Sequence, residues 1–205
     1  GADNRLLSDG TYNYAYDAEG NRIARICIAT GAVSRYTWDA RNRLVLVTDH
    51  ASEGGAATQI VRFLYDTQNH WIGEDVDKDG DGMVDHRRRF AYDGEQIALQ
   101  FDKDGVGEVT AADLSHRYFW RAAVDQLLAD ERTSLDEKGG LATADVLWAL
   151  SDHLGSVRDV VRFDGKTTSV VNHVVFGSFG EVVSESNPAE GSLFGLTARP
   201  QSEAT

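Results

Sequence analysis

Apolar and polar residues alternate with a period of two along several short stretches of the chain. Aromatic side chains stand at every second position in 12–16, 36–38 and 63–65, and strand-like runs follow at 22–26 and 43–47. A period of two is typical of a β-strand that buries one face. The pattern therefore predicts an all-β fold of short antiparallel strands.

An aromatic residue followed directly by aspartate recurs between these stretches. The pairs are Tyr16-Asp17, Trp38-Asp39, Tyr65-Asp66, Tyr92-Asp93, Phe101-Asp102 and Phe163-Asp164. In the first three pairs, Gly20, Asn42 and Asn69 follow three residues after the aspartate, and these residue types tolerate the left-handed backbone conformation. An aspartate carboxylate can accept hydrogen bonds from the N–H groups just ahead of it. We therefore predict that Asp17, Asp39 and Asp66 anchor turns completed by Gly20, Asn42 and Asn69.

The aromatic residues of successive pairs are 22, 27 and 27 residues apart, so the hairpins form a repeat. One hairpin cannot cover its own apolar face, and neighbouring repeats must stack on it. Residues 52–57 lengthen the second repeat. Residues 122–131 fit a short helix or a strand, and residues 133–143 are predicted to be a loop.

Composition narrows the classes of function. The 205 residues include 20 Gly and only 2 Pro, and the formal net charge is −13. This charge repels phosphate backbones and anionic lipid, so we expect no nucleic-acid partner. No apolar run approaches the ~18 residues that span a bilayer, so we expect no membrane insertion. Cys27 is the one cysteine, which excludes a disulfide within the chain.

An acidic segment at residues 74–86 is the sharpest local signal for a ligand. Residues 77–85 read Asp-x-Asp-x-Asp-Gly-x-x-Asp. Ca²⁺ prefers several oxygen ligands wrapped around it by a sharply turning loop. The predicted ligands of a structural Ca²⁺ ion are Asp77, Asp79, Asp81, the carbonyl of Met83, and Asp85.

This calcium loop departs from an EF-hand, because Arg88 stands where that motif has a bidentate glutamate and the flanking residues favour strands. The competing interpretation is a solvated acidic hairpin that Arg87, Arg88 and Arg89 partly neutralise. A second acidic group at 102–113 is better explained by another aromatic-aspartate turn at 102–105.

The aromatic-Asp-x-x-Gly/Asn period resembles the YD-repeat, or RHS-repeat, family. The segment 151–159 is similar to the element that opens the RHS-associated core region, and 124–129, 174–182 and 194–199 resemble further elements of that region. Gly177 and Ala198 depart from the family's usual aspartate and glycine. The resemblance divides the chain into repeats at 1–150, the start of the core region at 151–199, and a disordered tail at 200–205.

The resemblance implies an antiparallel ribbon of YD-repeat hairpins that is a segment of a spiral β-shell. Such a protein is a non-enzymatic scaffold, secreted or on the cell surface, whose partners are neighbouring repeats and its own C-terminal effector, a toxin. The alternative is an adhesion module that binds glycans or surface proteins, for which exposed Trp71, Trp120 or Trp148 would offer stacking surfaces.

Catalysis has little support in the sequence. Ser156 and Ser178 lie outside the Gly-x-Ser-x-Gly motif, and the six histidines are scattered without metal-binding spacing. His153 follows Asp152, but no nucleophile and pocket accompany them. A strand-end histidine bonded to backbone is the simpler interpretation, so the chain is predicted not to be an enzyme.

Overall fold

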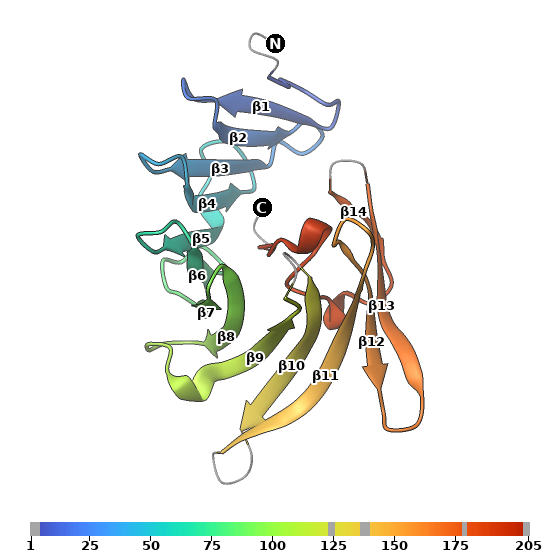
Figure 1. Cartoon of the computed structure of the whole chain (residues 1–205). Coiled ribbons are helices and arrows are strands. Elements are labelled where there is room, and N and C mark those ends of the chain that lie inside the picture. Colours follow the sequence, from blue (N-terminus) through green and yellow to red (C-terminus); the bar gives the residue numbers. More distant parts are fainter. Residues whose placement is uncertain (1–4, 123–125, 136–139, 178–179, 203–205) are drawn as a thin grey trace. The chain divides into compact units, whose positions relative to one another are not determined.

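Each strand of the protein pairs with the strand that follows it in the chain. The computed structural model describes residues 5–122, 126–135, 140–177 and 180–202, and its 14-stranded sheet has the order β1 to β14 without a crossover (Figure 1). Neighbouring strands of the described part of the chain run antiparallel, as at β1–β2, β3–β4, β10–β11 and β13–β14. The predicted all-β, antiparallel ribbon is therefore confirmed.

The strands have the following bounds: β1 Tyr12–Tyr16, β2 Arg22–Cys27, β3 Val33–Trp38, β4 Leu44–His50, β5 Ala57–Tyr65, β6 Trp71–Asp77, β7 His86–Asp93, β8 Gln96–Asp104, β9 Leu114–Trp120, β10 Leu127–Leu135, β11 Leu141–Ser151, β12 Val157–Phe163, β13 Thr168–Phe176 and β14 Val182–Glu185. Three short 3-10 helices accompany them: η2 Ala111–Asp113, η3 Pro188–Glu190 and η4 Leu196–Ala198.

Two details of the sequence prediction are settled by β10 and β11. Residues 127–131 are strand, not helix, whereas residues 123–125 lie outside the described part of the chain. The loop predicted at 133–143 is wrong at both ends, because Thr133 pairs with Thr143 and Leu135 with Leu141. Polar residues there prolong a hairpin whose backbone is paired, and residues 136–139 lie outside the description.

The chain divides into two compact units, Gly1–Arg89 with Asp102–Val109, and Phe90–Phe101 with Thr110–Glu203. The boundary predicted at residue 150 separates the repeats from the core region by their sequence patterns and does not describe compact units. It stays a prediction.

The core of the first unit lies on one face of β3 to β6. Tyr36, Val47, Val61 and Val76 stand opposite one another in successive strands, so their side chains share this face. Tyr36, Val47, Val61 and Phe63 are buried, and further apolar side chains pack around them, namely Trp38, Leu44, Tyr65, Trp71 and Val76. The alternating pattern of the sequence thus corresponds to one continuous apolar face.

The core of the second unit lies on one face of β9 to β13. Tyr118, Leu147 and Val160 are buried there, and Phe194 and Ala198 from the C-terminal segment cover them. Part of the predicted disordered tail is ordered, since Pro200 bridges to Phe194 and the Gln201 N–H donates to the Leu193 carbonyl at 2.9 Å. Residues 203–205 lie outside the described part. Within that part, no helix is long and apolar enough to cross a membrane.

Substitution at Val61 tests whether the first unit depends on this face. Val61 is 1% exposed, so Val61→Ala removes two buried methyl groups and should lower the free energy of unfolding by about 2–3 kcal/mol. Val106, in the same unit, is 87% exposed, and Val106→Ala should change stability by less than about 0.5 kcal/mol. Urea unfolding of both variants measures the difference; equal stabilities would contradict the assignment of the core.

Candidate functional site

The turn at Asp39 shows how an aspartate reverses the chain. The Asp39 N–H donates to the Arg43 carbonyl at 2.9 Å, and the Asn42 N–H donates to the Asp39 carbonyl at 3.0 Å. Asp39 Oδ1 accepts the N–H groups of Arg41 and Arg43 at 2.8 and 3.0 Å, while Oδ2 accepts Arg43 Nε at 2.7 Å. The carboxylate therefore holds both the turn backbone and the side chain four residues ahead.

The turns at Asp17 and Asp66 repeat this arrangement with a different fourth residue. Asn21 donates its N–H and Nδ2 to the two oxygens of Asp17, and His70 donates its N–H to Asp66 Oδ1 with Nδ1 2.8 Å from Oδ2. Asparagine, arginine and histidine thus fill one role because each places a donor nitrogen at the carboxylate. The predicted left-handed residues are confirmed, with φ of 95° at Gly20, 56° at Asn42 and 74° at Asn69.

A β-bulge lies beside each of these turns, and its extra residue, Ile23, Val45 or Ile72, belongs to the strand that follows the turn. The register shifts between Ala15 and Tyr16, between Thr37 and Trp38, and between Leu64 and Tyr65. A bulge adds one residue to one strand and increases the local twist. The aromatic residues of these three pairs therefore stand at the same place relative to their turns.

The turn hydrogen bonds favour the ionised aspartate. At Asp39 the backbone N–H and the side chain of Arg43 lower the pKa below its usual value, against an opposing effect of burial. At Asp17 and Asp66 burial raises the pKa, but the hydrogen bonds from Asn21 and His70 outweigh it and the net pKa is lowered. These carboxylates are therefore charged at neutral pH.

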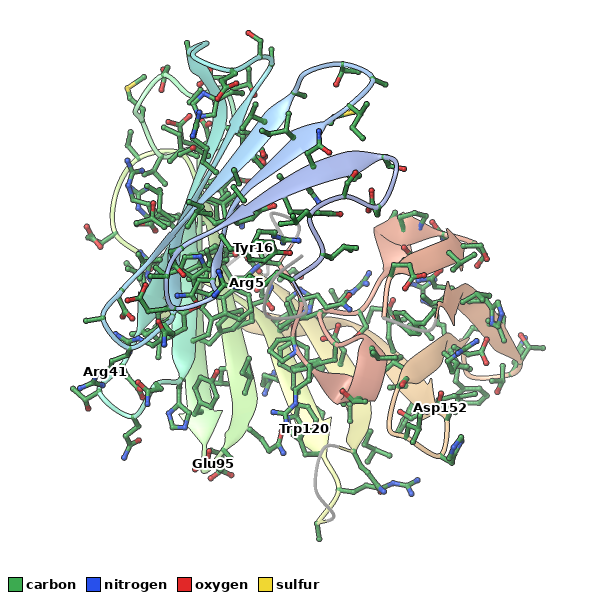
Figure 2. All side chains as sticks on the ribbon, turned by 90° about the horizontal axis from the view of Figure 1, so that it is seen from above. Arg5, Tyr16, Arg41, Glu95, Trp120 and Asp152 are labelled. Carbon is green, nitrogen blue, oxygen red and sulfur yellow. The ribbon has the colours of Figure 1, made fainter. Side chains whose placement is uncertain are left out.

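Arginine side chains connect one turn to the next. Arg43 Nη1 donates to the Asp66 carbonyl at 3.1 Å, and its guanidinium carbon lies 4.8 Å from the centre of the Tyr65 ring. Arg5 is placed in the same way on the first turn, with Nη1 3.0 Å from the Asp17 carbonyl and the guanidinium 5.9 Å from the Tyr16 ring (Figure 2). The same contact, here called an arginine bracket, therefore occurs twice: an arginine from an earlier segment of the chain binds the aspartate carbonyl and lies near the aromatic ring of a later aromatic-aspartate pair.

The segment at Asp152 proves to be a further turn of this type. Asp152 Oδ1 accepts the N–H groups of Leu154 and Ser156 at 2.9 and 3.0 Å, and Gly155 has φ of 83°. Ser151 replaces the aromatic residue before the aspartate, so the aromatic-aspartate pattern missed this turn. The spacing of Asp152 and Gly155 was the signal that could have found it.

Two more turns keep the backbone bonds without an aspartate. The Gly177 N–H donates to the Glu181 carbonyl at 2.8 Å, and the Gly195 N–H donates to the Arg199 carbonyl at 3.1 Å. The Glu181 carboxylate lies where a Cβ at residue 177 would stand, beside the glycine that replaces the expected aspartate. Ala198 holds the left-handed position of the second turn, with φ of 51°.

The predicted turn at 102–105 is wrong at Asp102. This residue lies in β8, where its carboxylate accepts Arg88 Nε at 3.0 Å and lies 3.2 Å from His86 Nε2. Asp104 lies 2.9 Å from the other ring nitrogen of His86. Two acids of this group, Asp102 and Asp104, therefore contact side chains of β7.

The acidic hairpin brings together three of the five predicted calcium ligands. Carboxylate oxygens of Asp77, Asp79 and Asp85 lie within 4.8 Å of one another. Asp81 is outside this group and instead accepts the Met83 N–H at 2.7 Å, and the Met83 side chain is 64% exposed. The group consists of carboxylate oxygens, so the backbone carbonyl of Met83 stays a predicted ligand.

Asp77 is the buried member of the group, with no exposed surface. Its oxygens accept the N–H groups of Gly80 and Gly82 at 2.6 and 2.8 Å. Burial raises the pKa of Asp77, but these backbone hydrogen bonds outweigh it and the net pKa is lowered. A buried carboxylate therefore stays ionised beside two other acids, which suits an oxygen-seeking cation.

The neighbouring arginines pair with acids of the strands. Arg88 Nη1 lies 3.1 Å from Glu74 Oε1, and Arg89 Nη2 lies 2.7 Å from Asp75 Oδ1. Arg87 donates to the Gly105 carbonyl at 2.8 Å. Arg88 and Arg89 thus neutralise two acids of the segment 74–86, as the competing interpretation expects. Among the described residues, Asp77, Asp79 and Asp85 form no ion pair with an arginine.

Two of the residues considered for catalysis, Asp152 and Ser156, have structural roles, and Ser178 lies outside the described residues. Asp152 anchors its turn, and Ser156 is fully buried with its Oγ accepting the Thr197 N–H at 3.1 Å. Of the three candidate stacking tryptophans, Trp120 donates Nε1 to the Ile97 carbonyl and Trp71 packs on Phe63. Trp148, at 42% exposed, offers the largest open surface of the three.

These features define a hairpin-repeat protein whose repeat unit is closed by an aspartate turn. The sequence profile of the RHS Repeat matches residues 16–56, so the repeats of this stretch are RHS repeats, as the sequence predicted. This match includes the complete turns at Asp17 and Asp39. Among curated proteins, none matches the chain.

Several solved structures have similar stretches. A crystal structure of TcdB2-TccC3 is 12% identical with a TM-score of 0.43, and covers 83% of this chain and 11% of that one. The Tc holotoxin pore of Photorhabdus luminescens is 11% identical with a TM-score of 0.37, and covers 83% of this chain and 12% of that one. The chain spans about a tenth of these structures.

The Asp39 turn can be tested by substitution. Asp39→Asn keeps one acceptor for the backbone N–H groups but loses the charge that attracts Arg43, and Asp39→Ala loses both. We expect the melting temperature to fall by a few degrees in Asp39→Asn and further in Asp39→Ala. Calorimetry measures both melting temperatures. Glu19→Ala, which removes an exposed acid from the first turn, should leave the melting temperature unchanged.

The pH dependence of this effect has a defined sign. The pKa of Asp39 is lowered in the folded state, so its contribution is complete above the unfolded pKa of about 4 and is lost as pH falls through the folded pKa. The difference between the wild type and Asp39→Asn should therefore be largest near neutral pH and shrink below about pH 4. A difference that grows on acidification would contradict the ionised turn.

Proposed function

We propose that this chain is a non-enzymatic segment of a shell built from RHS-type hairpin repeats, in a secreted or cell-surface protein. The shell encloses or presents a C-terminal effector, in line with the family resemblance. The observation that carries the proposal is the uninterrupted strand order in which aspartate turns close successive hairpins, together with the RHS repeat at 16–56. A sheet that is extended in this way, one hairpin after another, forms the wall of a shell.

Protease protection in the full-length protein tests this function. If the repeats wall off the effector, the effector should survive a protease concentration that degrades it when expressed alone. Weakening two turns together, with Asp39→Ala and Asp66→Ala, should increase cleavage of the effector. The matched variant Glu19→Ala with Glu53→Ala, which alters exposed acids of the same repeats, should not. An effector that is cleaved equally fast in every form would refute enclosure.

We also propose that the acidic hairpin holds a structural Ca²⁺ ion. The convergence of Asp77, Asp79 and Asp85 supports this, because carboxylate oxygens of all three lie within 4.8 Å of one another and offer a cation several oxygen ligands. The flanking strands β6 and β7 place the site in a hairpin, so an affinity near the 10⁻⁴–10⁻³ M of extracellular modules is expected. The ion would fix the loop without taking part in chemistry.

Thermal unfolding with calcium and with chelator tests the site. At ~10 mM Ca²⁺ and a dissociation constant of ~0.3 mM, binding should stabilise the fold by about 2 kcal/mol relative to chelator. Asp79→Asn should remove most of this gain, and Asp93→Asn, an exposed acid on another hairpin, should retain it. Melting curves that coincide with and without calcium would exclude the site.

An adhesion surface is a second candidate function, supported by one feature. Trp148 is 42% and Phe119 46% exposed, and both stand opposite Ala129, so they share one face of the sheet. Exposed aromatic rings on one face suit stacking against sugars. A glycan array on which the wild type and Trp148→Ala give the same empty pattern would remove this candidate.

A further inference from the structure

The C-terminal segment Asn187–Gln201, here called the latch, covers one face of the second unit. This face belongs to β9–β13 and carries Tyr118, Asp130, Leu147 and Arg162, which stand opposite one another in successive strands. The latch contains η3 and η4 and adds no strand to the sheet (Figure 1, red). It therefore lies on the sheet as a bound peptide does.

Glu190 is the first anchor of the latch. Its Oε2 lies 2.6 Å from Arg132 Nη1 of β10, and its Oε1 lies 2.9 Å from Arg162 Nη2 of β12. Asp145 of β11 binds the same Arg162, at 2.5 Å. The Glu190 side chain is only 20% exposed. Two guanidinium groups from separate strands thus converge on one carboxylate of the latch.

Phe194 is the second anchor and is 2% exposed. Its ring meets Tyr118 at 4.9 Å between ring centres and Trp120 at 4.8 Å, with interplanar angles of 90° and 86°. Edge-to-face pairs of this kind add attraction beyond the burial of area. The two aromatic residues of β9 form a defined seat for a phenyl ring.

Buried polar groups of the sheet bind the latch backbone. Ser156 Oγ accepts the Thr197 N–H at 3.1 Å, and Asn172 Oδ1 accepts the Asn187 N–H at 2.9 Å. The Val157 N–H donates to the Gly195 carbonyl at 3.2 Å. Ser156 and Asn172 have no exposed surface, and a buried polar group without a partner is costly. These side chains are therefore placed to receive a peptide backbone.

The latch leaves a gap in its packing against the sheet. A small space lined by Leu127, Leu147 and Val160 remains under Gly191 and Ser192. The strand that leads to the latch, β14, pairs with β13 through only three residue pairs and is mostly exposed. Release of the latch therefore breaks the two anchors and the hydrogen bonds to Ser156, Val157 and Asn172, and none of these contacts belongs to the strand pairing of β9–β13.

We propose that this face is a peptide-binding site that recognises a glutamate four residues before a phenylalanine, and that the latch is its ligand bound within the chain. Arg132 and Arg162 select the carboxylate, Tyr118 and Trp120 select the ring, and Ser156 and Asn172 fix the backbone between and around them. A separate peptide with the same two anchors occupies the face once the latch is released.

The chain's own latch competes strongly with such a peptide. A tethered segment acts at an effective concentration in the millimolar range, so the wild type binds a separate peptide weakly. Glu190→Gln with Phe194→Ala removes both anchors and vacates the face while leaving the sheet residues intact. A fluorescent peptide of residues 186–202 should bind this variant at least about tenfold more tightly than it binds the wild type.

Two controls make the binding specific. The same peptide carrying Glu190→Gln and Phe194→Ala should fail to bind, and the chain variant Glu19→Gln with Phe163→Ala, which alters an exposed acid and an exposed phenylalanine, should bind no more than the wild type. Absence of binding to a vacated chain that keeps its β-type circular dichroism, or equal binding of the two peptides, would overturn the proposal.

If the variant Glu190→Gln with Phe194→Ala does not fold, hydrogen exchange of the wild type tests the proposal instead. The backbone amides of Thr197 and Gln201 should exchange together and faster than the paired amides of β10 and β11, because the latch opens without unfolding the sheet. Exchange of these latch amides at the rate of the β11 amides would mean that the segment is part of the core, and the proposal would fail.

Discussion

The structure depends on a carboxylate that holds the backbone N–H groups just ahead of it. At Asp17, Asp39 and Asp66 this one interaction reverses the chain, sets the left-handed residue three places on, and captures a donor side chain at the fourth. Because the carboxylate is satisfied within its own turn, each turn is defined by local sequence alone. The hairpins depend on each other for their shared apolar face and for the strand pairing between β2 and β3 and between β4 and β5, as the units of a repeat protein do.

The second unit keeps this geometry with other chemistry. Its turns at Gly177 and Gly195 retain the backbone bonds without an aspartate, and the Glu181 carboxylate occupies the space beside Gly177. Its core is also closed differently, since Phe194 and Ala198 come from a segment that follows the last strand. The core of the second unit thus includes residues that lie far along the chain from β9 and β10.

The sequence reveals local features of this fold better than distant ones. Asp39 and Asn42 could be assigned because the turn that they form is encoded within a few residues. The latch contacts could not be predicted, since nothing near Glu190 indicates that Arg132 and Arg162 face it from two different strands. At the acidic hairpin the spacing identified Asp77, Asp79 and Asp85, whereas the outward position of Asp81 depends on the bend of the loop.

The aspartate turns join β1 to β2, β3 to β4 and β5 to β6, and the intervening connections at residues 28–32, 51–56 and 78–85 follow no common pattern. The connections along one margin of the ribbon, formed by the aspartate turns, are consequently constant in length. The connections along the other margin, here called the free margin, differ in length. Insertions at the free margin leave the pairing register and the arginine brackets undisturbed. The acidic hairpin lies at this margin, so a repeat could acquire or lose a ligand-binding loop there while the rest of the ribbon kept its geometry.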